Sequence, residues 1–350
     1  MTRKSRLGLV FLLILGLPAA ADDLFPVPDG LQPDVDFWID IFSHYTTAEG
    51  VLHDNRNLAV VYETIDLPAD MGRRDRQRRV AKRREHYQAI RRTQARGKRD
   101  NLSEEEAQVL AVWPEGVSDA TLSAAVRQIR YQPGRRDRGR EGRERSGRWR
   151  AYIENEFRAL GVPVELAALP HVESSYNPEA RSHVGASGIW QFTRSTGRRF
   201  MRIDHVLDER NDPWAASRAA GKLLAYNYSI TGNWPMAITA YNHGLSGVRR
   251  AMREFGDTAY SDILREYDGR TFGFASRNFY VAFLAAKHVD QNAQTYFPGV
   301  QVESPTNYAM FELDAYIAAE DLSDALGVTS RQLAAHNMAL QSTIWQGSKH

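Results

Sequence analysis

The sequence contains no cysteine among its 350 residues. This absence excludes disulfides, thiolate metal sites, iron–sulfur clusters and a cysteine nucleophile, and it removes a lipidated amino-terminal cysteine as a membrane anchor. Long apolar runs are scarce as well, since the longest, Leu7 to Leu17, falls short of the roughly 20 residues that span a bilayer. We therefore expect no transmembrane anchor, and any chemistry must come from oxygen and imidazole groups.

Residues 1–21 have the pattern of a secretory signal. Basic residues precede the apolar run, and Ala19 to Ala21 supplies the small residues of a cleavage site before Asp22. We expect the mature protein to begin near Asp22 and to be exported and soluble. Export without cysteine suits an envelope protein that has no need of oxidative folding.

The formal net charge of +2 conceals two basic blocks, residues 73–99 with a local charge of +11 and residues 135–150 with +5. For both blocks, a solvent-exposed charged face is the simpler interpretation, and contact with anionic envelope polymers is the more specific one. Nucleic acid is not an expected partner, because the signal directs the chain away from it and the second block lacks interleaved aromatic residues. The first block predicts a charged helix, whereas the mixed glycine and arginine of the second predict a linker or loop.

Proline, glycine and capping residues divide the mature chain into three parts. Residues 22–147 form an N-terminal extension, with an aromatic-rich helix at 34–45 and a β-branched strand at 59–65 before the charged helix and the Gly/Arg-rich linker. Residues 148–297 read as a compact all-helical domain, because cap, proline and glycine signals recur at helical lengths. Its helices are expected over 163–174, 213–232, 235–244, 246–256 and 276–289, the last one capped by Ser276.

The third part, residues 298–350, predicts two short helices at 322–326 and 330–337. This order resembles a small sugar-binding LysM-like unit, which is α+β. Its closing strand would lie past His350, so the unit is either truncated or degenerate.

One acidic residue falls on an apolar stripe. Leu166, Pro170 and Glu173 stand at helical spacing, which turns the glutamate inward. Burial favours the neutral acid, the form that a general acid needs near neutral pH. A helix-end glutamate paired with an arginine explains the same pattern, and periodicity leaves the two interpretations even.

Three other segments combine polar and aromatic groups. Residues 185–192, GASGIWQF, place glycines before Trp190, Gln191 and Phe192, where aromatic faces could pack against sugar rings. Residues 240–244, AYNHG, end a helix with Tyr241 and Asn242. Each segment also has an ordinary structural interpretation, as a turn, a helix cap or, for Tyr280 on a later helix, a core tyrosine.

Taken in order, ESSYNP (173–178), GASGIWQF (185–192), AYNHG (240–244) and an N-x-Y at 278–280 resemble the family 1 lytic transglycosylases of bacterial cell walls, and within them the subgroup of lytic murein transglycosylase D. Residues 37–67 are also similar to the extension of that subgroup. The resemblance implies a mainly α fold with a lysozyme-like (goose-type, SLT) catalytic domain, and a periplasmic location.

The resemblance also implies roles for individual residues. Glu173 corresponds to the catalytic acid. The substrate-binding positions would be Ser174, Ser187, Gln191, Tyr241, Asn242 and Tyr280, the last a cleft tyrosine that positions the glutamate. Two departures from the family pattern concern the geometry: His243 replaces the usual small residue of AYN-x-G, and residues 274–277 read FASR where many members have a Glu-Thr pair.

The implied reaction cleaves the β-1,4 bond between N-acetylmuramic acid and N-acetylglucosamine, with Glu173 as the single acid and base and a 1,6-anhydromuramoyl product. It requires no metal or organic cofactor. The first rival is a lysozyme-like muramidase that uses water, with Asp204, Asp208 or Asp212 as second carboxylate. The second is a non-catalytic peptidoglycan-binding protein.

Overall fold

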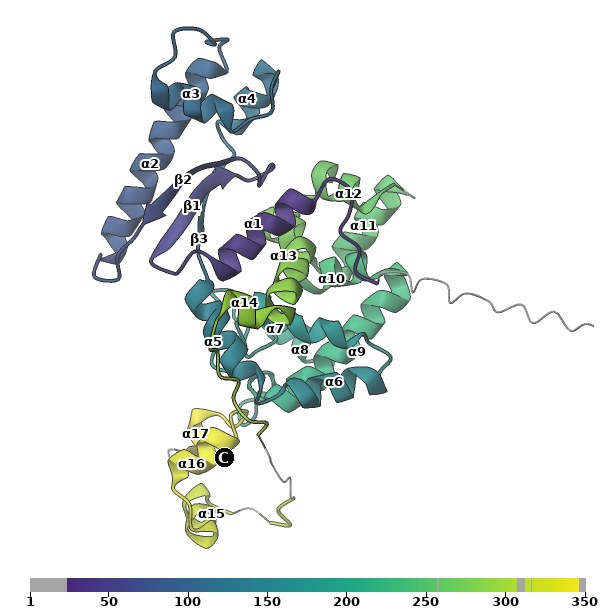
Figure 1. Ribbon diagram of the computed structural model, residues 1–350. Helices are drawn as coiled ribbons and strands as arrows, with labels where there is room; N and C mark the ends of the chain where they lie inside the picture. Colours follow the sequence, from purple (N-terminus) through teal and green to yellow (C-terminus); the bar gives the residue numbers. More distant parts are fainter. Residues whose placement is uncertain (1–23, 257, 307–311, 316, 346–350) are drawn as a thin grey trace, which may run out of the picture.

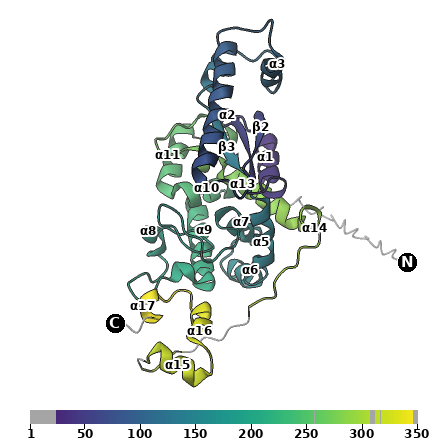
Figure 2. The ribbon, with the colours of Figure 1, turned by 90° about the vertical axis from the view of Figure 1, so that its left-hand side faces the viewer.

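The computed structural model describes residues 24–256, 258–306, 312–315 and 317–345, so the predicted signal sequence lies outside the described residues. Figure 1 shows three stacked parts: a mixed sheet-and-helix extension at the top, a helical domain in the middle and short C-terminal helices at the bottom. The turned view in Figure 2 keeps this order. Within the described residues, no helix combines the length and apolar character needed to cross a bilayer.

The mainly helical character predicted for the central domain is confirmed. Asp212 caps its long helix α9 by accepting hydrogen bonds from the N–H groups of Trp214 (2.8 Å) and Ala215 (3.0 Å). Gly232 ends the same helix with φ of 73°, a conformation that costs glycine little. The elements of this domain are α6 (Arg150–Ala159), η1 (Val164–Ala168), α7 (Leu169–Glu173), α8 (Arg194–Gly197), η2 (Glu209–Asn211), α9 (Pro213–Thr231), α10 (Trp234–His243), α11 (Leu245–Phe255), α12 (Tyr260–Glu266), α13 (Phe274–Gln291) and α14 (Ala293–Tyr296).

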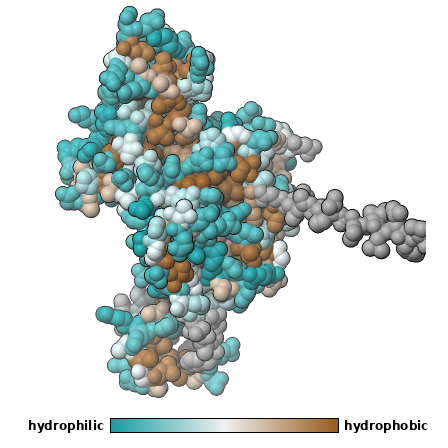
Figure 3. Space-filling model, viewed as in Figure 1, coloured by the Kyte–Doolittle hydropathy of each residue, from teal (hydrophilic) through white to brown (hydrophobic). Residues whose placement is uncertain are grey.

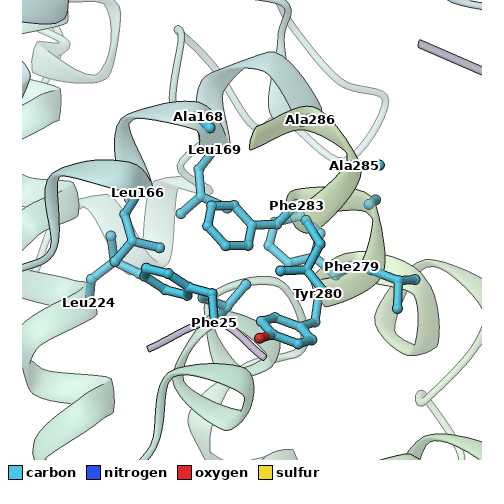
Figure 4. Close-up of a cluster of buried hydrophobic side chains, with 14 of the residues drawn as sticks. Phe25, Leu166, Ala168, Leu169, Leu224, Phe279, Tyr280, Phe283, Ala285 and Ala286 are labelled. Carbon is cyan, nitrogen blue, oxygen red and sulfur yellow. The ribbon is translucent and has the colours of Figure 1, made fainter. Parts of the chain in front are cut away.

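Helix α13 runs through the centre of the domain and is buried along most of its length. Figure 4 shows Phe283 of α13 among Leu166, Leu169 and Leu224, which come from three other elements. Phe25 of the chain's proline-rich lead-in enters the same cluster, and its ring lies 5.2 Å from that of Phe283. Phe25 is therefore part of the core of the helical domain, whereas the preceding Leu24 is exposed.

The N-terminal extension packs on this core through α1 (Gln32–Ser43), which lies along α13. A three-stranded antiparallel sheet follows, in the order β2–β1–β3, with β1 at Glu49–Asp54, β2 at Val61–Asp66 and β3 at Ile129–Pro133. The N-terminal extension also contains helices α2 (Arg73–Gln94), α3 (Glu104–Ala111) and α4 (Asp119–Ala125). The predicted first helix, charged helix and β2 are confirmed, whereas the sequence prediction did not include β1 and β3.

The predicted Gly/Arg-rich linker is wrong, because residues Arg136–Ser146 form helix α5. Its glycines allow close packing: a Cβ at Gly139 would lie 2.8 Å from the carbonyl oxygen of Phe42, and one at Gly142 would lie 2.9 Å from that of Ser175. Its arginines bind other parts of the protein instead of solvent alone. Arg143, for example, reaches Asp290 of α13 at 3.3 Å.

Two details of the predicted helices are also wrong. The segment expected as one helix over 163–174 is split into the 3₁₀ helix η1 and the single α-turn α7. The helical-wheel relation between Leu166 and Glu173 therefore does not hold, although both residues face the interior side. Helix α13 begins at Phe274 after Gly273, so Ser276 lies inside it and is not its cap.

The two predicted C-terminal helices are confirmed as α15 (Ala319–Leu326) and α16 (Ser330–His336), followed by α17 (Ser342–Trp345). No strand is assigned among the described residues of this part, so the LysM-like unit stays a prediction. Hydrophobic residues gather on this part in Figure 3, and Leu313, Ile317 and Leu326 are exposed. Contact with the helical domain runs through a short antiparallel bridge between Leu207 and Leu340.

Gly142→Ala tests the close approach between α5 and the turn after α7. Alanine is favoured over glycine in a helix by about 1 kcal/mol, so an uncrowded site would gain stability. Here the added methyl group meets a backbone oxygen, and we expect the free energy of unfolding to fall by about 1–3 kcal/mol in urea denaturation.

The control is Gly72→Ala, where the nearest atom to the new methyl group is a carboxylate oxygen of Asp75 at 3.7 Å. Gly72 is the N-cap of α2, where alanine is less favourable than glycine, so this variant should lose less than about 1 kcal/mol. A Gly142→Ala protein as stable as the control would contradict the packing argument.

Candidate active site

The residues expected to carry chemistry meet in a cleft of about 400 Å³ on the helical domain. Glu173 comes from the end of α7, Gln191 from the turn that follows Gly188, and Tyr241 and Asn242 from the end of α10. The cleft is completed by Ser182, Val184, Ala186, Phe192, Thr193, Thr196, Leu223, His243 and Gly244. Four of the seven predicted site residues thus line one cavity.

The turn after Glu173 has an uncommon backbone. Ser175 and Tyr176 have φ of 52° and 55°, in the left-handed region that non-glycine residues seldom adopt. Arg145 of α5 donates to the carbonyl oxygen of Ser175 from Nη2 at 2.8 Å and from Nε at 3.3 Å, and Gly142 packs against the same peptide. Helix α5 therefore supports the turn that sets the position of Glu173.

Burial dominates the electrostatics of Glu173. Removal from water penalises the charged carboxylate and raises the pKa of Glu173 to about 8, although the positive charge of Arg135 acts in the opposite direction. Arg135 is held close by a 3.0 Å hydrogen bond from its Nη1 to the carbonyl oxygen of Val172. At neutral pH the carboxyl of Glu173 is therefore largely protonated and can donate a proton.

Tyr241 closes one side of the cleft in a rigid aromatic cluster. Its hydroxyl donates to the carbonyl oxygen of Trp190 at 2.8 Å, and its ring lies 6.0 Å from Phe192 and stacks at 6.4 Å on Phe279. Burial, together with the nearby charge of Glu173, raises the pKa of Tyr241 well above its ordinary value. The phenol stays neutral, with its oxygen available as an acceptor.

Gln191 fixes the glycine turn. Its φ is 48°, and its Nε2 donates to the carbonyl oxygens of Ala180 (3.0 Å) and Gly188 (2.8 Å). Both amide hydrogens are thus used within the protein, which leaves Oε1 as the group that can accept from a ligand.

The two departures from the family pattern meet in one hydrogen-bonded chain. Nδ1 of His243 lies 3.1 Å from Oγ of Ser276, and that hydroxyl donates to Oδ1 of Asn242 at 3.4 Å. The imidazole is confined by the ring of Phe272, 4.9 Å away, and it fills the space that a Cβ at Gly247 would need. Since Ser276 donates to Asn242, His243 donates from Nδ1, and the amide nitrogen of Asn242 is left for a ligand.

Two of the predicted serines face away from the cleft. Ser174 donates from Oγ to the carbonyl oxygen of Ile189 at 2.8 Å. Ser187 is buried, and its Oγ donates to Oδ1 of Asn211 at 2.5 Å. Neither residue lines the cleft, and both tie the walls of the cleft to neighbouring segments.

The expectation of a cleft position for Tyr280 is wrong. Its side chain is fully buried in the core, with its ring against Tyr260 and Phe283 (Figure 4). Its hydroxyl donates to the carbonyl oxygen of Pro26 at 2.9 Å. Tyr280 is therefore a core tyrosine, which was the other interpretation of its sequence position.

Among the described residues that line the cleft, only one carries a carboxyl group. The candidates for a second catalytic carboxylate are used elsewhere. Asp204 accepts from Arg202 at 2.6 Å, a bond that lowers its pKa, and Asp212 caps α9. Asp208 is buried against Arg210, whose hydrogen bonds and charge outweigh burial and hold the pKa of Asp208 below its usual value. The described residues also contain no group of three or more acidic or histidine side chains that could hold a metal ion.

Sequence reasoning missed the supporting residues of the site. Arg135 and Arg145 lie in the segment interpreted as a linker, and their contacts with α7 and its turn join positions 37 and 30 residues apart. His243 and Ser276 were visible only as departures from a motif. The only sequence signal for these four residues was that they lie in segments of unusual composition. Such a signal does not show which residues they contact.

Comparison with known proteins identifies the class of this domain. Residues 151–264, about a third of the chain, match the family described as "Transglycosylase SLT domain". This part of the chain is therefore similar to the SLT domain, and the predicted resemblance and the predicted lysozyme-like helical class are confirmed for it.

Individual relatives show the same similarity. Membrane-bound lytic murein transglycosylase D of Escherichia coli (strain K12) is 35% identical over 104 residues, which cover 29% of this chain and 23% of that protein. A putative tributyltin chloride resistance protein of Alteromonas sp. (strain M-1) is 36% identical over 110 residues, covering 31% of this chain and 53% of that protein. The chain thus spans between about a quarter and a half of the length of these relatives.

Among solved structures, an inactive mutant of the lytic transglycosylase Slt from Pseudomonas aeruginosa is similar, with 23% identity and a TM-score of 0.34. The match covers 44% of this chain and 25% of that one.

The raised pKa of Glu173 predicts a pH-dependent stability. The unfolded chain ionises this carboxyl above pH 4.5, whereas the folded protein retains the proton until about pH 8. The contribution of Glu173 to stability is thus fully present below pH 4.5 and is lost as pH rises to about 8. Relative to Glu173→Gln, the wild type should lose up to about 1.4 kcal/mol per pH unit in this window, measured by urea unfolding at a series of pH values.

The matched control is Glu179→Gln, since Glu179 is exposed and lies outside the cleft. Its stability difference from the wild type should stay constant over the same pH range. A constant difference for Glu173→Gln as well would show that its carboxyl is not desolvated.

Proposed function

We propose that this protein is a peptidoglycan lytic transglycosylase that cleaves the β-1,4 bond between N-acetylmuramic acid and N-acetylglucosamine and leaves 1,6-anhydromuramic ends. The observation that carries the proposal is the single carboxyl in the described lining of the cleft, that of Glu173, with a pKa of about 8. Most retaining and inverting hydrolases have a second carboxylate across the cleft.

In the proposed reaction, Glu173 first acts as an acid. Its proton passes to the glycosidic oxygen as the bond from that oxygen to C1 of the muramic residue breaks. The N-acetyl oxygen of the substrate stabilises the developing positive charge at C1. The resulting Glu173 carboxylate then takes the proton of the C6 hydroxyl as that oxygen bonds to C1, so the acid is regenerated and no water is consumed.

The surrounding groups fit this sequence of steps. The Glu173 carboxylate is formed in the cleft, where burial makes it a strong base, and Arg135 limits the cost of its negative charge. Asn242 can donate from its free amide nitrogen, and Gln191 can accept at Oε1, so the two can orient the hydroxyl and N-acetyl groups of the sugar. We assign Ser174 and Ser187 to positioning of the cleft walls.

The structural use of Asp204, Asp208 and Asp212 weighs against the lysozyme-like muramidase, because each is held by an arginine or by a helix end. The carboxyl in a formed cleft weighs against a non-catalytic binding protein. We further propose that the protein is exported to the periplasm, where peptidoglycan strands are its substrate.

Contact with anionic envelope polymers is proposed for both basic blocks. The first block has the larger set of exposed cations, which includes Arg73, Arg74, Arg78, Arg79, Lys82, Arg84, Arg92 and Arg96. In the second block, the side chains of Arg135, Arg143, Arg145 and Arg150 bind the helical domain, whereas those of Arg136, Arg138, Arg140 and Arg148 are exposed.

Digestion of purified sacculi tests the reaction. The wild type should release muropeptides with anhydro ends, lighter by one water than reducing-end products in mass spectrometry. Glu173→Gln should be slower by about 10²–10⁴-fold, the usual contribution of general acid–base catalysis, while Glu179→Gln keeps wild-type turnover. Equal turnover by Glu173→Gln would overturn the catalytic assignment, and reducing-end products would favour the muramidase.

The pH dependence of the rate tests the coupling to Arg135. Turnover at limiting substrate should decline as pH rises through about 8, where Glu173 loses its proton. Arg135→Met removes a nearby positive charge that lowers the pKa of Glu173, so the alkaline decline should move to higher pH. Arg136→Met, with an exposed side chain on the same helix, should leave it in place. If the alkaline decline of Arg135→Met stays at the wild-type pH or moves to lower pH, the assignment is contradicted.

A further inference from the structure

A second cavity, of about 380 Å³, lies where the N-terminal extension meets the helical domain. One wall comes from α1 and the loops of the sheet, and the other comes from α12 and α13. The lining residues are Leu31, Asp34, Asn55, Arg56, Gln128, Leu264, Arg265, Arg277, Asn278 and Val281. This cavity shares no lining residue with the cleft that holds Glu173.

Positive charge dominates the cavity, because three arginines face one acidic residue. Backbone carbonyl oxygens, which carry no net charge, hold the guanidinium groups in place. Arg56 donates to the carbonyl oxygen of Arg265 at 3.2 Å, Arg265 to that of Gly30 at 2.6 Å, and Arg277 to that of Tyr267 at 2.9 Å. These bonds position the guanidinium groups without neutralising their charges.

The arginine at the base of the cavity is the least satisfied. Nε of Arg277 is buried without a hydrogen-bond partner among the described residues. Its nearest carboxylate, Asp268 at 3.7 Å, is 92% exposed and so well screened. Burial, followed by repulsion from Arg56, lowers the pKa of Arg277.

The one acidic residue of the lining offsets at most one of the three positive charges. Burial raises the pKa of Asp34 to about 6, against the opposing charge of Arg265, so this carboxyl is mostly ionised near neutral pH and partly protonated below it. Near neutral pH the lining of the cavity thus keeps a net positive charge.

We propose that this cavity binds an oxyanion, a carboxylate or phosphate group carried by a small molecule or peptide. Guanidinium groups bind such groups through paired hydrogen bonds, and the amides of Asn55 and Gln128 add donors at the rim. The volume lies in the range of small-molecule sites and exceeds what a single ion fills. The ligand would bridge the extension and the helical domain, since Arg56 belongs to the first and Arg277 to the second.

Isothermal titration calorimetry on the whole chain tests the site, with inorganic phosphate in one arm and glutarate in the other at constant ionic strength. The wild type should bind at least one of the two, and the arm that binds identifies the chemical source. Arg56→Gln should weaken that binding at least tenfold; Arg56 is exposed, so this variant is expected to fold even if Arg277→Gln does not. Arg249→Gln, an exposed arginine outside the cavity, should bind as the wild type does.

Glu173→Gln should also retain binding, because the two cavities are separate; this separates the proposal from the proposed reaction. Absence of binding in both arms would overturn the inference. So would equal affinity in wild type and Arg56→Gln, or an equal loss in Arg249→Gln, since either result assigns the binding to non-specific surface charge.

Discussion

The withdrawal of one carboxyl group from water is the constraint on which the site depends. A carboxylate in such a place is costly, and the protein avoids the cost by keeping Glu173 protonated until about pH 8. Arg135 lies near enough to temper this effect without forming a full ion pair. The side chain is thus suited both to give up a proton and to recover it, as the proposed reaction requires.

The scaffold that permits this burial is not confined to the SLT domain. Helix α5 precedes the matched region and supports the left-handed turn after Glu173 through Arg145 and the close approach of Gly142. Through Arg135 the same segment reaches α7. The N-terminal extension therefore supports the candidate active site, although it lies outside the residues that match the SLT family.

Sequence patterns predicted those elements whose signals are local. Asp212 and Gly232 bound α9 because a cap and a left-handed glycine act within one turn of the helix. Helix α5 could not be predicted in this way. Its glycines lie at close contacts with peptides that are distant in the sequence, and it has arginines where an amphipathic helix has apolar residues. The inward position of Glu173 was predicted from a regular helix, but the structure divides that segment into η1 and α7. The burial of Glu173 therefore comes from packing against other segments and not from helical periodicity. Tyr280 shows the opposite error: its motif position suggested the cleft, and packing places it in the core.

The proline-rich lead-in segment contributes a side chain to the core of the helical domain. Phe25 is 3% exposed among the rings of Trp234 and Phe283, with Lys287 over its face. Removal of Phe25 would leave a ring-sized void in the core of the helical domain, which also holds the candidate active site. The stability of that domain therefore depends on a residue that lies more than a hundred positions before it in the sequence.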